Sequence, residues 1–170
     1  MKKAIVIYKS KTGFTKRYAE WIGEALGCPA IPFKEAEMSD LNGYDTIIYG
    51  GGFYAGMISG IKWFKGNLPK WEGKQLLVFG TGASPNESPD IHKALKQNFT
   101  EEEWQKVKAF YMQAGLNYEK MSRGERMAMA VFRTMMKKSA GEDSEAYRMI
   151  QSSYDITDKE LIKPLIESIK

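Results

Sequence analysis

Three hydroxyl side chains and a glycine are grouped in the stretch SKTGFT, where an apolar segment gives way to an amphipathic one. Ser10, Thr12 and Thr15 surround Gly13. The first turn of a helix leaves backbone N–H groups unpaired, and its dipole favours negative charge, so hydroxyl donors around a glycine there suit a phosphate group. The same residues could instead serve as a helix cap. This stretch therefore predicts either a phosphate cradle or an ordinary cap.

Two further loops are rich in glycine and follow predicted strands. DTIIYGGG ends at Gly52 and leads into Phe53 and Tyr54, and KQLLVFGTGAS carries glycines at 80 and 82. The backbone of glycine residues can approach the flat ring of a ligand closely, and Phe53 and Tyr54 could stack on such a ring. An aromatic residue after a strand more often covers the core, but a phosphate cradle beside two such loops favours a flat, phosphorylated ligand.

Other ligand motifs do not hold. Gly50 to Ala55 fits G-x-G-x-x-A, yet a dinucleotide fingerprint belongs to the first strand-to-helix turn and is followed by an acidic residue after the next strand. No Walker-type loop is present in the sequence. A single cysteine and a single histidine exclude a disulfide framework and a zinc site built from these residues. No side chain in the three loops is typical of a catalytic acid or base.

Strand and helix signals alternate along the chain. Short apolar runs, typical of strands buried on both faces, occupy 4–8, 30–33, 45–52, 74–84 and 108–118. Helical patterns cover 18–26, 58–68, 88–99, 100–107, 119–141 and 157–169, with capping boxes at Thr100 and Thr157 and a bend expected at Pro164. We therefore predict an α/β fold, a doubly wound five-stranded parallel sheet of order 2-1-3-4-5 with a helical insertion after the fifth strand. This order brings the three loops to one edge of the sheet.

The charge is concentrated in one segment. The chain carries a net charge of +4, and residues 119–138 alone hold six basic and two acidic side chains, so the remainder is neutral. With 170 residues and 43% hydrophobic composition, we expect one domain over 1–170, with a basic helical insertion at 119–155. The N-terminal apolar run is too short for a signal peptide, so we expect a cytoplasmic protein.

The basic segment also carries apolar side chains that fall on one helical face: Met121, Ala128, Val131, Phe132, Met135 and Met136. Such a face usually covers a core. Its basic surroundings favour instead an interaction surface for a partner or for an anionic lipid headgroup layer, so residues 119–138 predict a peripheral membrane contact at the inner face. We expect no nucleic-acid partner.

SKTGFT resembles the phosphate loop of the flavodoxin superfamily, Ser/Thr-x-Thr-Gly-x-Thr, at every defined position, and the resemblance extends over nearly the whole chain. It implies bound FMN, with its phosphate held by Ser10, Lys11, Thr12, Gly13, Phe14 and Thr15. One edge of the flavin ring would lie against Gly51, Gly52, Phe53, Tyr54, Ala55 and Gly56. The other edge would lie against Thr81, Gly82 and Ala83.

The C-terminal half resembles a narrower group, the flavodoxin-type menaquinone-dependent protoporphyrinogen oxidases, through AGLNYEKMS, the basic helical segment and DITDKELIKPLIESI. It departs from that group at Ala140-Gly141-Glu142, with one glycine fewer, and at Phe53, where the group tends to carry a basic residue. The sequence pI of about 9.0 also differs from the acidic character of electron-shuttling flavodoxins.

The resemblance implies an FMN-dependent redox protein that exchanges electrons with a partner protein or a small redox substrate. Two alternatives stay open: an FMN-dependent oxidoreductase acting on a porphyrinogen or quinone, and a flavodoxin-fold binding module without a cofactor.

Overall fold

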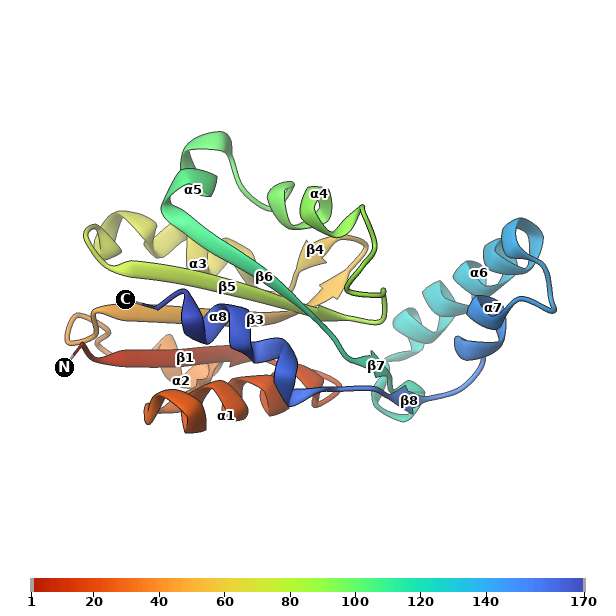
Figure 1. Ribbon diagram of the computed structural model, residues 1–170, viewed down its shortest axis with the longest axis horizontal. Coiled ribbons are helices and arrows are strands. Elements are labelled where there is room, and N and C mark those ends of the chain that lie inside the picture. Colours follow the sequence, from red (N-terminus) through yellow and green to blue (C-terminus); the bar gives the residue numbers. More distant parts are fainter. Residues whose placement is uncertain (1, 170) are drawn as a thin grey trace.

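A parallel sheet forms the centre of the protein, and helices cover both of its faces (Figure 1). The computed structural model describes residues 2–169. The five main strands run parallel in the order β2-β1-β3-β5-β6. They are β1 (Ala4–Lys9), β2 (Ala30–Pro32), β3 (Thr46–Tyr54), β5 (Gln75–Gly82) and β6 (Val107–Gln113). The predicted α/β class and the strand order 2-1-3-4-5 are confirmed.

Three two-residue strands accompany these: β4 (Met57–Ile58) pairs with β3 in the central sheet, whereas β7 (Gly115–Leu116) and β8 (Tyr154–Asp155) form a separate two-stranded sheet. The longer helices are α1 (Phe14–Leu26), α3 (Ile61–Asn67), α4 (Ile91–Lys96), α5 (Glu101–Lys106) and α6 (Arg123–Ala140). The shorter ones are α2 (Phe33–Ala36), α7 (Glu145–Met149) and α8 (Lys163–Glu167), with 3₁₀ turns η1 (Leu68–Trp71), η2 (Tyr118–Lys120) and η3 (Lys159–Ile162).

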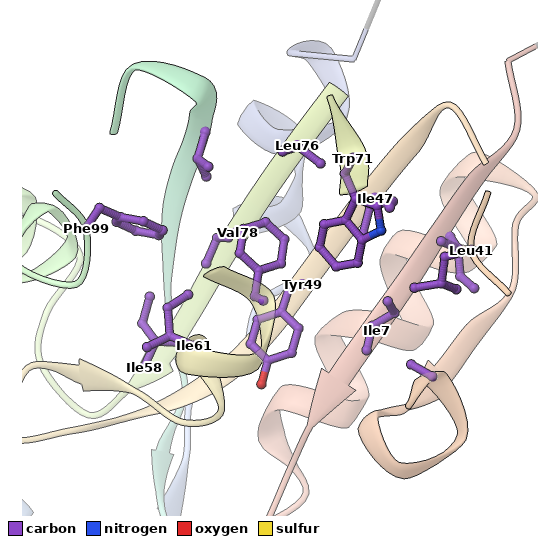
Figure 2. Close-up of a cluster of buried hydrophobic side chains, with 14 of the residues drawn as sticks. Ile7, Leu41, Ile47, Tyr49, Ile58, Ile61, Trp71, Leu76, Val78 and Phe99 are labelled. Atoms are coloured by element: carbon purple, nitrogen blue, oxygen red, sulfur yellow. The ribbon is translucent and has the colours of Figure 1, made fainter. Parts of the chain in front are cut away.

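The alternation of side chains along each strand divides the core into two layers. On one face Ile5, Ile47 and Val78 pack with residues of α3, η1 and α4, among them the fully buried Phe64. Figure 2 shows this layer, with the ring of Trp71 lying over the strands. On the other face Val6, Ile48 and Leu77 pack against α1, η3 and α8. Because both faces are covered, the strands are apolar throughout.

The start of the last predicted helix differs from the structure. The last helical segment begins with η3, capped by the side chain of Asp158 instead of Thr157, and α8 starts only at Lys163. Pro164 therefore occupies the first turn of α8, where the N–H that it lacks has no helical partner, instead of the interior of a helix. Helix α3 ends at Asn67, within one residue of the predicted end, and Pro69 follows in η1. The capping box of Thr100 with Glu103 is confirmed.

The insertion extends beyond the carboxyl end of the sheet (Figure 1). Strands β7 and β8 pair antiparallel through Gly115 with Asp155 and close its two ends. Its main helix, α6, begins with a capping box of Ser122 and Glu125, and none of its residues is buried. Its apolar face does not cover the sheet, and four of its large apolar residues are exposed: Met127, Val131, Phe132 and Met135.

Among the described residues, no helix combines the length and the apolar character needed to cross a membrane.

Candidate functional site

The N-terminus of α1 has no side-chain cap. Gly13 is the residue that precedes the helix, with a φ of 96°, and no side chain accepts a hydrogen bond from the first turn. The Ser10 hydroxyl instead accepts a hydrogen bond of 3.2 Å from the Gly13 N–H, within the loop. Helices α5 and α6, by contrast, both begin with complete capping boxes. The cap interpretation of SKTGFT is therefore wrong, and the first-turn amides of α1 stay open toward this loop.

The first and third loops meet at two threonines. The hydroxyl oxygens of Thr15 and Thr81 lie 2.7 Å apart in a hydrogen bond, and both residues are buried. Thr81 stands opposite Gly52 of β3 in the sheet register. The topology thus brings residues of all three predicted loops to one edge of the sheet, as the strand order predicted.

The second loop is a β-hairpin. Strand β3 continues through the glycines to Tyr54 and pairs antiparallel with β4, Phe53 opposite Ile58 and Tyr54 opposite Met57. Ala55 and Gly56 form its two-residue turn with φ values of 50° and 78°, as hairpins of this length require positive φ at both positions. The strand predicted over 45–52 therefore runs two residues further, and Phe53 and Tyr54 lie in extended strand instead of the expected loop.

The two aromatic residues of this hairpin differ in their surroundings. The Phe53 ring packs edge-on against Tyr111, with 5.6 Å between ring centroids, and lies so close to Gly80 that a Cβ there would stand 2.2 Å from it. A Cβ on Gly82 would approach the Tyr111 hydroxyl within 2.9 Å. These glycines therefore make room for rings of the protein itself. Tyr54 is exposed, which leaves it as the hairpin's aromatic side chain available to a ligand. Ala83, next to Gly82, is half-buried.

The base of the insertion contacts the first two loops, which the sequence did not reveal. Asn117 Nδ2 donates a hydrogen bond of 3.3 Å to the carbonyl oxygen of Thr12. The Glu125 carboxylate forms an ion pair of 2.8 Å with Lys11 and lies near enough to the Tyr54 hydroxyl for its charge to raise the pKa of that group. The phosphate-type loop is therefore tied to the start of α6, which also lies beside the hairpin.

Electrostatics at this junction follow from these contacts. Burial raises the pKa of the Glu125 carboxyl, but the hydrogen bonds from Lys11 and Ser122 outweigh it and hold the pKa below its usual range. Burial, followed by the neighbouring charge of Glu125, raises the pKa of the Tyr54 hydroxyl. At neutral pH the site therefore combines an ionised carboxylate, paired with Lys11, and a neutral phenol.

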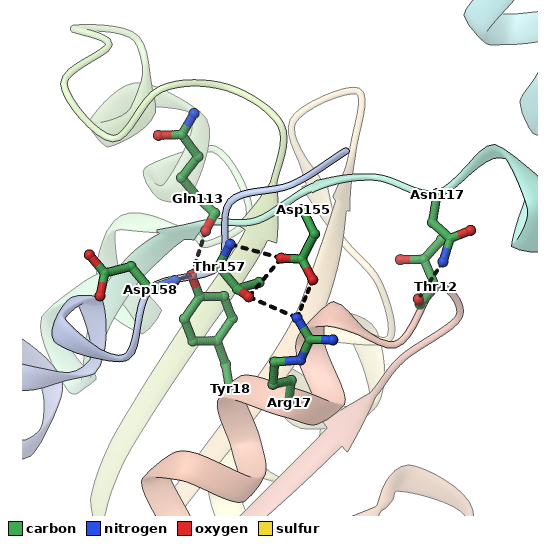
Figure 3. A network of polar contacts seen from close by, with 8 residues as sticks. All are labelled: Thr12, Arg17, Tyr18, Gln113, Asn117, Asp155, Thr157 and Asp158. Carbon is green, nitrogen blue, oxygen red and sulfur yellow. Dashed lines mark hydrogen bonds and ion pairs between the residues drawn. The ribbon is translucent and has the colours of Figure 1, made fainter. Parts of the chain in front are cut away.

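Helix α1 also anchors the two ends of the insertion, as Figure 3 shows. The buried Tyr18 hydroxyl donates to the carbonyl oxygen of Gln113 and accepts a hydrogen bond of 3.1 Å from the Asp158 N–H. Arg17 forms an ion pair with Asp155 and donates a hydrogen bond of 2.8 Å to the Thr157 hydroxyl. The helix whose N-terminus faces the first loop thus also fixes the insertion.

Comparison with known proteins gives one family match and several matches of fold. A family model described as Flavodoxin domain matches residues 5–144. No curated protein matches the chain. The Trp repressor binding protein from Bacillus subtilis is 14% identical and superposes with a TM-score of 0.50 over 75% of this chain and 94% of its own. A WrbA-like flavodoxin from Agrobacterium tumefaciens is 21% identical, with a TM-score of 0.49 over 74% of this chain and 88% of its own.

Proposed function

Because this chain belongs to the flavodoxin domain family, we propose that it is a redox protein that binds FMN and transfers electrons through the flavin. When bound, FMN supplies one-electron and two-electron chemistry that no side chain can provide. The protein's part is to bind the cofactor, to orient it and to expose it to a partner.

The open N-terminus of α1 is the observation that carries this proposal. Its amides have no side-chain cap, the glycine at position 13 has positive φ, and Ser10, Thr12 and Thr15 add hydroxyl donors next to them. Such a donor set fits a phosphate dianion, which helix N-termini favour through their unpaired N–H groups and their dipole. We propose that residues 10–15 hold the phosphate of FMN.

The other two loops would flank the flavin ring. Exposed Tyr54 at the hairpin supports a stacking role, and the turn of Ala55 and Gly56 presents backbone beside it. Thr81, Gly82 and Ala83 would lie at the opposite edge. We propose no catalytic acid or base among these residues, since His92 lies exposed on α4, outside the three loops. Electron exchange through an accessible flavin requires none.

A second candidate, an FMN-dependent oxidoreductase for a porphyrinogen or quinone, is favoured by the insertion. Its exposed apolar side chains and its basic residues lie on one helix next to the candidate site, as a lipophilic or acidic substrate would require. Turnover assays with a porphyrinogen and a menaquinone analogue distinguish this enzyme from an electron carrier. In either case we propose a cytoplasmic location.

The experiment that tests the proposal is analysis of flavin in the purified protein. We expect absorbance bands near 375 and 450 nm, or their appearance when the apoprotein is titrated with FMN, and release of FMN on denaturation. Release of FAD would contradict the choice of cofactor. A protein that binds no flavin after reconstitution would instead be a binding module that keeps the fold, and the proposed function would be wrong.

A further inference from the structure

The base of the insertion places a lysine beside the phosphate-type loop. Lys120, the last residue of η2, has its Nζ atom 3.5 Å from the position that a Cβ would take on Gly13. Its backbone is fixed, because the Lys120 N–H donates a hydrogen bond of 3.3 Å to the Asn117 side chain. Asn117 in turn donates to the carbonyl oxygen of Thr12. One turn of the insertion therefore carries both a contact to the loop backbone and a cation next to it.

The neighbouring charges around this loop are already compensated. Lys11 pairs with Glu125 at 2.8 Å, Lys16 with Glu20 at 3.7 Å, and Arg17 with Asp155.

The carboxylate closest to Lys120 in sequence, that of Glu119, also has a hydrogen-bond partner. Glu119 accepts a hydrogen bond of 2.6 Å from the Ser153 hydroxyl. No acidic side chain within the described part of the chain forms an ion pair with Lys120 itself, so its ammonium group is a positive charge left over beside the open amides of α1.

The space between these groups is an open cleft of about 520 Å³. Thr12, Gly13 and Lys16 line it from the side of α1, and Asn117 and Lys120 line it from the insertion. Three carboxylates also line it: Glu20 is paired with Lys16, Asp155 with Arg17, and Glu119 accepts a hydrogen bond from Ser153. The cleft is within the size range of small-molecule sites. A cation at its wall and unpaired amides at the helix N-terminus both favour a negatively charged group there.

We propose that Lys120 is a phosphate-binding residue, which the insertion adds to the loop at residues 10–15. This inference rests on the proposed binding of FMN. The hydroxyl and amide donors of the loop are neutral, whereas the Lys120 ammonium contributes a charge-assisted hydrogen bond to the phosphate dianion. The insertion is then part of the cofactor site, and its presence raises affinity for the phosphorylated form of the flavin.

The test compares FMN with riboflavin, which has the same ring and ribityl chain but no phosphate. Apoprotein of the parent and of Lys120→Met, Lys120→Arg and Lys138→Met is titrated with each flavin, and the quenching of flavin fluorescence gives the dissociation constant. Lys138→Met is the matched control, because it removes the same charge from the exposed far end of α6.

We expect Lys120→Met to weaken FMN binding about tenfold. This loss is at the low end of what a hydrogen bond to a charged group contributes, because the lysine is exposed. Riboflavin affinity should be unchanged. Lys120→Arg should restore FMN binding to within about threefold of the parent, and Lys138→Met should bind as the parent does. The difference between parent and Lys120→Met should shrink in 0.5 M KCl, because salt screens exposed charges.

Two results would overturn the inference while leaving the proposed function intact. Equal FMN affinity in Lys120→Met and Lys138→Met would show that the ammonium does not reach the phosphate. An equal loss for riboflavin and FMN would show that Lys120 only supports the local structure. A parent protein that binds neither flavin would overturn the proposed function and this inference together. Urea midpoints measured for each variant separate a loss of binding from a loss of folding.

Discussion

Replacement of Tyr18 by phenylalanine tests whether α1 holds the two ends of the insertion. The side chain is fully buried, and its hydroxyl joins Gln113, just before the insertion, to Asp158, just after it. The ring remains in place in the variant, so no cavity forms and only the two hydrogen bonds are lost. The Gln113 carbonyl oxygen and the Asp158 N–H then lose their hydrogen-bond partner. Leaving a buried polar group unpaired costs about 1–3 kcal/mol of stability. Because both contacts are only partly buried, we expect a total loss of about 1–3 kcal/mol in the free energy of unfolding.

Urea unfolding followed by circular dichroism measures this loss. If the unfolding free energy depends on urea concentration with the same slope in the parent and in the variant, both proteins unfold by the same reaction. Tyr8→Phe is the matched control, because the half-buried Tyr8 hydroxyl makes no hydrogen bond with the part of the chain that the structure describes. Hydrogen exchange should also become faster around residues 154–158. If Tyr18→Phe and Tyr8→Phe lose equal stability, the hydroxyl does not hold the insertion and the reasoning fails.

Three further predictions concern the cofactor, alkaline stability and the insertion. Thr12→Val should weaken FMN binding by about 1.5–3 kcal/mol without loss of the fold, because one hydroxyl bond to a charged group is removed; unchanged affinity in a fluorescence titration would contradict it. Burial raises the pKa of the Tyr49 and Tyr111 hydroxyls above the usual value of 10.0, so these groups ionise in the unfolded chain while they stay neutral in the folded one. The contribution of these two groups to stability should therefore be constant below pH 10 and fall above it by about 1.4 kcal/mol per pH unit for each tyrosine, and a flat profile of unfolding free energy between pH 9 and 11 would refute this. Met127→Ser combined with Met135→Ser should change stability by less than about 0.5 kcal/mol, since both side chains are exposed. If residues 119–138 form the membrane contact predicted from the sequence, the parent should co-sediment with phosphatidylglycerol vesicles and the double variant should do so less; a parent that does not co-sediment, or equal binding of the two proteins, would contradict that prediction.

The parts of the fold that could be predicted are those with a local or periodic signal. Apolar strands alternating with amphipathic helices predicted the α/β class and the doubly wound strand order. Pro32, which cannot donate a ladder hydrogen bond, lies in the edge strand β2. SKTGFT indicated the position of the candidate site, because hydroxyl side chains at a strand-to-helix turn are suited to binding a phosphate group. The capping box at Thr100 was similarly readable from four residues.

The remaining features depend on contacts that are distant in the sequence. The hairpin at Ala55 was not expected, because alanine rarely adopts positive φ and the glycine run before it favoured a loop. A Cβ on Gly80 would meet the ring of Phe53, and a Cβ on Gly82 would meet the Tyr111 hydroxyl, constraints that no local pattern in the sequence indicates. Asn117 and Thr12 are separated by 105 positions, and no local pattern indicates such a pair.

The structure also shows that the basic side chains of the insertion have different roles, which the net charge alone could not reveal. Arg126 donates a hydrogen bond of 3.0 Å to the Tyr118 carbonyl oxygen, and Arg133 lies 5.2 Å from the centre of the Tyr118 ring. These two arginines hold α6 against η2, so their replacement would disturb the turn that carries Lys120. Lys137 is paired with Glu142 at 3.0 Å. Three of the six basic side chains at residues 119–138 therefore contact other parts of the insertion. Any effect of an arginine variant on a membrane or a partner must be separated from an effect on the cofactor site beside it.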